Sequence, residues 1–227
     1  MGMAGSPRIH VMLLPLFFIG ISTLASATTL FILTNECSYT VWPATLSGDG
    51  AISGDGVFAL LPGDTSEFQS QAGWSGLIWA RTACVFDIND GNSHCLTGDC
   101  DGKLNCTVTA APPFTQAEFA IGSAGDKDVY DVSLVDGYNV GLSVRPTGGS
   151  GNCLTRGCAT DINAICPREL QVVDVGGAVV ACKRSATSYS EIFENACPKA
   201  SNNPYDHKTS SCSFPDYFIT FCPSNVN

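Results

Sequence analysis

The sequence predicts a mainly β protein, a disulfide-rich antiparallel β-sandwich with a small cysteine-rich lobe of loops and short helices. The 227 residues include 12 cysteines, 23 glycines and 12 prolines, and only 14% are charged. Several short runs alternate apolar and polar side chains, as half-buried strands do. Four cysteines fall between Cys84 and Cys106, in a polar segment with too few apolar residues to fold without covalent links.

The amino terminus has the pattern of a secretory leader. Arg8 is the only charged side chain in residues 1–27, an apolar run follows from Val11 to Leu24, and Ala25-Ser26-Ala27 gives the small-residue cleavage pattern. The run is short for a membrane span, and no second such run follows. We therefore expect residues 1–27 to be removed and the rest to be secreted, into the extracellular space or the cell wall, without a stable membrane anchor.

The rest of the chain is acidic. Without the leader it keeps 10 basic and 21 acidic residues, a net charge of −11. Such a surface repels phosphate backbones and anionic membranes, so we expect no nucleic-acid partner, whereas a neutral polysaccharide or a protein remains open. Nothing in the sequence indicates an organic cofactor or an obligate oligomer, and we expect a monomer.

A metal site is not expected either. The four cysteines of Cys84–Cys106 lack the C-x2-C spacing of zinc sites, and only two histidines lie outside the leader, which also disfavours a histidine-based triad. The segment 87–91 resembles a calcium loop in part. Its glycine comes one residue early and the terminal glutamate is absent, so we expect a turn there.

Six strands are expected between residues 29 and 144. Asp136-Gly137 is a turn signal between the fifth and the sixth, which predicts that these two strands form a hairpin. The expected strands are Thr29–Asn35, Cys37–Trp42 (ended by Pro43), Gly76–Thr82, Ala117–Ile121 with one carboxylate, Val129–Val135 and Tyr138–Val144.

The composition changes at Pro146–Asn152, which is rich in glycine. We expect this segment to close a sandwich of residues 28–152 and to lead into a disulfide-rich lobe of residues 153–212. In the lobe, Ser188 and Glu191 form a capping-box pattern that predicts a helix over Ser188–Ala196. Residues 213–227 are expected to carry a final strand back to the sandwich.

The segment Gly91–Cys106, GNSHCLTGDCDGKLNC, resembles the signature of thaumatin-like proteins, a family of small secreted, pathogenesis-related defence proteins. Ser93 stands where that signature usually has Gly or Phe. The resemblance extends to NECSYTVW at 35–42, IWART at 78–82, AEF at 117–119, YDVSLVDGYNV at 130–140 and CATDINAICP at 158–167. It implies the sandwich with a second lobe, which opens with a short helix.

Cysteine pairing does not follow from sequence alone. Larger family members have further cysteines between Cys166 and Ser188, and their absence here leaves Cys166 and Cys182 to pair with each other. The resemblance implies the other five pairs: Cys37–Cys222, Cys84–Cys95, Cys100–Cys106, Cys153–Cys212 and Cys158–Cys197. Asn105 begins a formal glycosylation sequon, but its middle residue is Cys106, which disfavours occupancy.

The family's antifungal members have an acidic cleft between the two lobes. Matched motif by motif, its carboxylates fall on Glu118, Asp131, Asp136 and Asp206, whereas the position of its arginine is Leu77 here. Each residue also has a structural explanation: Asp136 precedes a glycine in a turn, and Asp206 lies in a polar loop. Glu118 and Asp131 are more informative, because strands are depleted in acidic residues.

Three functions are compatible with such a cleft. The favoured one is binding of fungal β-1,3-glucan, since carboxylates accept hydrogen bonds from sugar hydroxyls without any reaction. The second is a weak endo-β-1,3-glucanase with Glu118 and Asp131 as candidate catalytic residues, or Asp136 in place of Asp131, with carboxyls about 5–5.5 Å apart for retention or about 6.5–9.5 Å for inversion. The third is an inhibitor of a microbial xylanase or another secreted hydrolase, which would use exposed loops.

Overall fold

The structure is a computed structural model that describes residues 1–2, 28–53, 59–87, 93–122, 126–184, 190–206 and 208–227. The expected leader, most of the partial calcium loop at 87–91 and the Ser188 end of the capping box lie outside the described residues. Within the described residues, no helix has the length and apolarity needed to cross a membrane.

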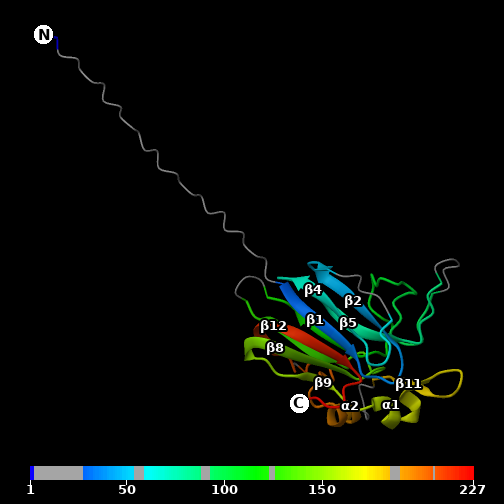
Figure 1. Cartoon of the computed structure of the whole chain (residues 1–227). Helices are drawn as coiled ribbons and strands as arrows, with labels where there is room; N and C mark the ends of the chain where they lie inside the picture. Colours follow the sequence, from blue (N-terminus) through cyan, green and yellow to red (C-terminus); the bar gives the residue numbers. More distant parts are fainter. Residues whose placement is uncertain (3–27, 54–58, 88–92, 123–125, 185–189, 207) are drawn as a thin grey trace.

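Ten strands form one curled sheet with two arms, and this arrangement confirms the predicted fold class. The first arm consists of four neighbouring strands: β2 (Val41–Asp49), β5 (Ser75–Thr82), β6 (Gln116–Ala120) and β7 (Asp128–Ser133). The second arm contains β8 (Leu142–Asn152), β12 (Ser210–Phe221), β1 (Thr28–Asn35), β4 (Thr65–Gln71) and β3 (Ile52–Ser53), and β9 (Arg156–Cys158) pairs with β8. Figure 1 shows β4, β1, β12 and β8 side by side.

Strand β12 joins the two arms. Its first residues, Ser210–Cys212, pair with β7, whereas the rest of the strand lies between β8 and β1. The pairing of β12 with β1 is parallel, unlike the other pairings of this sheet. A parallel pair needs a long connection, and here nearly the whole chain runs between the two strands.

The core lies between the arms and is rich in aromatic rings. Phe31 of β1 packs edge-on against Phe119 of β6, with ring centroids 5.0 Å apart, and Phe119 packs against Tyr217 of β12 at the same distance. Phe31 also contacts Trp74 at 5.5 Å. Each of these side chains is almost fully buried, and burying one such ring stabilises the fold by about 1.5–3 kcal/mol.

The predicted hairpin around Asp136-Gly137 is wrong. The turn forms, with the Gly137 N–H donating to the Leu134 carbonyl at 3.0 Å, but β8 starts only at Leu142 and pairs with β12 and β9. The intervening residues have other partners, because Tyr138 forms a bridge with Cys182 and the Asn139 amide donates to the Ala80 carbonyl. Gly137 has φ of 100°, and a Cβ there would meet Pro113 Cβ at 2.5 Å.

The lobe below the sheet in Figure 1 is small and covalently linked. It contains α1 (Ile162–Ile165), the 3-10 turn η1 (Arg168–Leu170), the strand pair β10 (Gln171–Val173) and β11 (Val179–Cys182), and α2 (Ser190–Ala196). The structure joins the same six cysteine pairs that were expected: Cys37–Cys222, Cys84–Cys95, Cys100–Cys106, Cys153–Cys212, Cys158–Cys197 and Cys166–Cys182.

Candidate functional site

The outer face of the first arm presents a row of three side chains across β5, β6 and β7. Leu77 lies opposite Glu118, and Glu118 lies opposite Asp131. Directly opposed residues of antiparallel strands have Cβ atoms about 4.5–5.5 Å apart. The intervening residues Ala117 and Val132 are fully buried in the core between the arms, so the row points the other way. Strand alternation therefore places the two carboxyl groups beside each other.

All four carboxylates expected at the site line one cleft. It has a volume of about 330 Å³ and lies between the outer face of the first arm and the loop 203–206 of the lobe. Its lining includes Glu118, Asp131, Asp136 and Asp206, together with Gln116, Val135, Asn203, Pro204 and Thr209.

The cleft continues into a second, larger hollow of about 630 Å³, and the two parts share Glu118, Asp131 and Thr209. The second part is more apolar, since Leu46, Leu77 and Phe119 contribute to its lining. Leu77 therefore lies in the site itself, where the resemblance places an arginine. The two parts of the cleft together offer carboxylates at one end and apolar surface at the other.

Asp131 is the most deeply buried of the four carboxylates. It is 8% exposed, and Ser201 Oγ donates to its Oδ2 at 2.7 Å. Burial raises the pKa of Asp131 to about 6, the hydrogen bond from Ser201 opposes this shift, and the negative charge of Glu118 adds to it. Asp131 can therefore hold a proton at mildly acidic pH.

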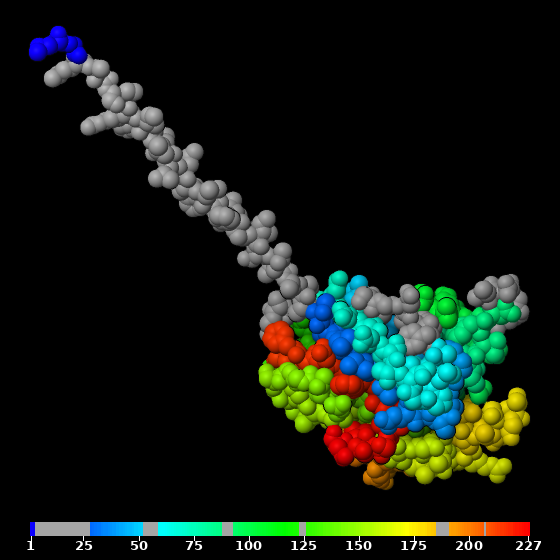
Figure 2. Space-filling view, viewed as in Figure 1, coloured from blue at the N-terminus to red at the C-terminus, as the bar shows by residue number. Residues whose placement is uncertain are grey.

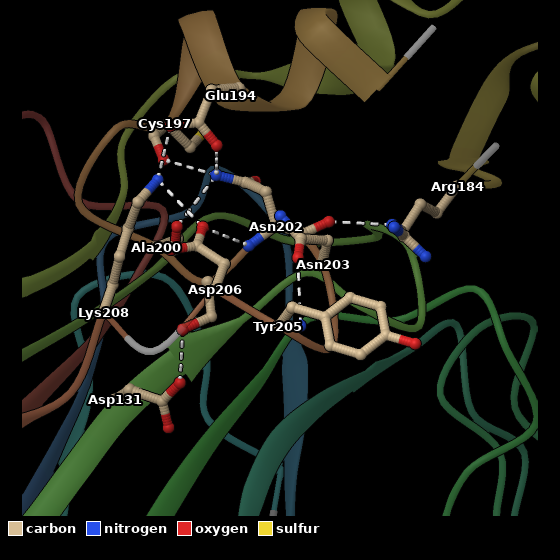
Figure 3. A network of polar contacts seen from close by, with 11 residues as sticks. Asp131, Arg184, Glu194, Cys197, Ala200, Asn202, Asn203, Tyr205, Asp206 and Lys208 are labelled. Carbon is tan, nitrogen blue, oxygen red and sulfur yellow. Dashed lines mark hydrogen bonds and ion pairs between the residues drawn. The ribbon is translucent and has the colours of Figure 1, made fainter. Parts of the chain in front are cut away.

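Among the described residues, the cations Arg156 and Lys208 lie near the carboxylates, and neither is at the position of Leu77. Arg156 is held by two hydrogen bonds, from Nε to Ser210 Oγ at 2.7 Å and from a terminal nitrogen to the Thr209 carbonyl at 2.8 Å. Its positive charge lowers the pKa of Asp131. Lys208 Nζ lies 3.1 Å from Asp206 Oδ2 and 2.7 Å from Glu194 Oε1. Figure 3 shows Lys208 and Asp206 in the polar network next to Asp131.

Sequence reasoning missed these cations and also missed Gln116. Gln116 Nε2 donates to Glu118 Oε1 at 2.8 Å, and its side chain is 7% exposed. Strand alternation could have identified it, because Gln116 lies two residues before Glu118 on the same face. Arg156 and Lys208 come from the lobe and from the segment before β12, where no periodicity indicates which way a side chain points.

A metal site is not apparent, since no three His, Cys, Asp or Glu side chains in the described part of the chain are grouped to hold an ion. The described lining of the cleft offers carboxyl, amide and hydroxyl groups, with the cations Arg156 and Lys208 nearby.

The sequence profile of the Thaumatin family matches residues 35–188. The chain belongs to the thaumatin family. It is 46% identical to "Pathogenesis-related protein 5" of Arabidopsis thaliana over 97% of this chain and 100% of that protein. It is 42% identical to a "Glucan endo-1,3-beta-glucosidase" of Prunus avium, over 83% of this chain and 88% of the relative. Its fold is similar to that of the thaumatin-like xylanase inhibitor TLXI, with a TM-score of 0.54 and 25% identity, over 85% of this chain and 99% of the other.

Proposed function

We propose that this thaumatin-family protein is a secreted defence protein that binds fungal β-1,3-glucan in its acidic cleft. The observation that carries the proposal is the gathering of Glu118, Asp131, Asp136 and Asp206 around one hollow. An ionised carboxylate accepts hydrogen bonds and donates none, and a glucan chain offers hydroxyl donors on every ring. The relative named "Pathogenesis-related protein 5" supports the role in defence.

The two-part shape of the acidic cleft favours a sugar chain over a single sugar. The carboxylate end leads into the hollow that contains Leu46 and Leu77, where the apolar faces of sugar rings can lie. Tyr205, which is 88% exposed, sits in the loop whose residues Asn203, Pro204 and Asp206 line the cleft (Figure 3). An exposed aromatic ring at the edge of a polar cleft supplies a further stacking surface.

Hydrolysis is a second candidate because of the state of Asp131. A glycosidase needs one protonated and one ionised carboxyl group on either side of the scissile bond. Asp131, with its pKa raised to about 6, supplies the acid, and Glu118 supplies the second carboxylate. Of the two candidate catalytic residues, Asp131 is the more deeply buried, and its burial favours it as the acid. The relative named as a glucan endo-1,3-beta-glucosidase supports this candidate.

Insoluble β-1,3-glucan tests both functions in one experiment. The oxidised protein, Glu118→Gln and Asp131→Asn are incubated with the glucan, and the bound protein and the released reducing ends are measured. We expect the wild type to sediment with the glucan and each variant to bind about two- to tenfold more weakly, because the amide still accepts a hydrogen bond but a neutral acceptor forms a weaker one than a carboxylate does.

Glu67→Gln is the matched control, because Glu67 lies on β4 of the other arm and is exposed. This variant should bind as the wild type does. Release of reducing ends that Asp131→Asn abolishes would establish hydrolysis. If the protein neither sediments with the glucan nor releases reducing ends, both functions are contradicted. That result would leave inhibition of a microbial xylanase or another secreted hydrolase, in line with the similarity to the inhibitor TLXI.

A further inference from the structure

A second groove lies apart from the acidic cleft. It has a volume of about 760 Å³ and shares no lining residue with either part of the cleft. It lies where the connection between β1 and β2 meets the lobe and the carboxyl-terminal tail. Figure 2 shows these three regions meeting on one side of the molecule, in blue, yellow-green and red.

The groove exposes aromatic and aliphatic surface. Tyr39 is 45% exposed and Leu96 is 44% exposed, while Trp42 is half-buried and Tyr138 is buried beside them. Apolar side chains that are gathered in a hollow, and not scattered singly, mark a site of interaction. Tyr and Trp rings in particular can stack against the apolar face of a sugar ring while their polar atoms stay hydrated.

The charges of the groove all have one sign. Glu36 and Asp161 line it, and none of the described lysine, arginine or histidine residues does. The Asp161 charge adds to the effect of burial in raising the pKa of the Tyr39 hydroxyl. A hollow with two carboxylates and aromatic faces attracts a cation by direct charge and by cation–π interaction.

Polar groups complete the lining. Ser38, Thr40 and Thr82 provide hydroxyl groups. Asn163 Oδ1 is buried and has no hydrogen-bond partner within the described residues. Asp161 accepts a hydrogen bond from the Asn163 N–H at 3.0 Å, which uses only part of the accepting capacity of a carboxylate.

We propose that this groove binds an oligomer of a protonated amino sugar, such as a glucosamine chain from deacetylated chitin. Its rings would lie on Tyr39 and Trp42, and its ammonium groups would face Glu36 and Asp161. A lysine side chain of a protein would satisfy the charge, but a lining that combines aromatic rings, hydroxyl groups and carboxylates matches a chain that carries hydroxyl and ammonium groups on every ring. This site is independent of the acidic cleft and adds a second polysaccharide to the proposed function.

Tryptophan fluorescence reports on this groove selectively. Of the three tryptophans, Trp74 and Trp79 are fully buried, so Trp42 alone responds to a ligand at the surface. The oxidised protein is titrated with glucosamine hexamer in mildly acidic buffer, and in parallel with N-acetylglucosamine hexamer and laminarihexaose. We expect a saturable change in emission with the glucosamine hexamer, at least about fivefold tighter than with either neutral oligomer, and its loss in Trp42→Phe.

Charge-neutral variants separate electrostatics from folding. Asp161 caps α1, and asparagine caps a helix equally well, so Asp161→Asn removes the charge and keeps the cap. We expect Asp161→Asn and Glu36→Gln each to weaken binding of the glucosamine hexamer by about two- to fivefold, with the larger effect at low salt. Calorimetric titration of the same variants supplies an affinity that does not depend on emission.

The proposal is overturned by any of the following: no saturable response to the glucosamine hexamer, equal affinity for the neutral oligomers, or unchanged affinity in the Asp161→Asn, Glu36→Gln double variant. Glu118→Gln separates this proposal from the proposed function, since it alters the acidic cleft only. Glucosamine binding that Glu118→Gln weakened would place the ligand in the acidic cleft and would also contradict the inference.

Discussion

Asp131 has a carboxyl group whose titration is coupled to folding. Its pKa rises from the ordinary 3.8 to about 6 in the folded protein. Between about pH 4 and pH 6 the folded state therefore binds more protons than the unfolded state, so the free energy of unfolding falls as the pH rises through this window. A shift of about two pKa units corresponds to about 3 kcal/mol at most.

Asp131→Asn should remove this dependence. Asparagine cannot ionise but still accepts the hydrogen bond from Ser201 Oγ, so we expect the variant to match the wild type at about pH 4 and to exceed it by about 1–3 kcal/mol at about pH 7. Denaturant unfolding of the oxidised proteins at both pH values measures this difference. A stability difference that stays constant with pH would contradict the shifted pKa. With Leu77→Arg present in both proteins, the difference in the free energy of unfolding between Asp131→Asn and the protein that keeps Asp131 should be smaller at about pH 7. The reason is that a guanidinium near Asp131 lowers the pKa of its carboxyl group.

At the scale of elements, Arg81 links the first arm to the cysteine-rich segment that covers its outer face. The side chain is fully buried and donates to the carbonyls of Pro43 on β2 and of Lys103 and Leu104 in that segment. Burial lowers the pKa of Arg81 to about 10, so the group remains a cation at neutral pH. Its planar fork supplies donors in several directions at once.

Arg81→Lys should therefore destabilise the fold although it keeps the charge. A lysine ammonium cannot reach carbonyls on both sides, and each lost hydrogen bond to a charged donor is worth about 1.5–3 kcal/mol, so we expect a loss of about 2–4 kcal/mol. Arg145→Lys is the control, because Arg145 is exposed and stacks on the Phe218 ring at 4.5 Å; it should cost less than about 1 kcal/mol. Equal effects of the two substitutions in thermal unfolding would contradict this role.

Glu118 and Asp131 were expected at the site from the resemblance to the family's acidic cleft and from the rarity of carboxylates in strands. Their direct opposition depends on how β6 pairs with β7, which the structure shows. Arg156 and Lys208 could not be placed, since their position depends on how the lobe packs against the sheet. The hairpin at Asp136-Gly137 failed for a similar reason: its turn is local, whereas the pairing of β8 with β12 is set by contacts distant in the sequence.

At the scale of the whole molecule, Cys37–Cys222 closes nearly the entire chain. The bond joins residues 185 positions apart, beside the parallel pair β1 and β12 that holds the same two ends together. Cys166–Cys182, by contrast, spans 16 positions within the lobe. In the chain-entropy account, the longer loop restricts the unfolded state more, which gives about 5 kcal/mol for the first bond and about 3 kcal/mol for the second.

Removing each bond by paired substitution to alanine should reveal this order. We expect Cys37→Ala with Cys222→Ala to lower the free energy of unfolding by about 2 kcal/mol more than Cys166→Ala with Cys182→Ala. The first change should reduce protection from hydrogen exchange in β1 and β12, whereas the second should act mainly on β10 and β11. Because neither cysteine of the lobe bond lines the acidic cleft, glucan binding should survive the lobe variant while it remains folded. A greater loss from the lobe bond would show that the lobe, and not the closure of the sheet, limits the stability of the molecule.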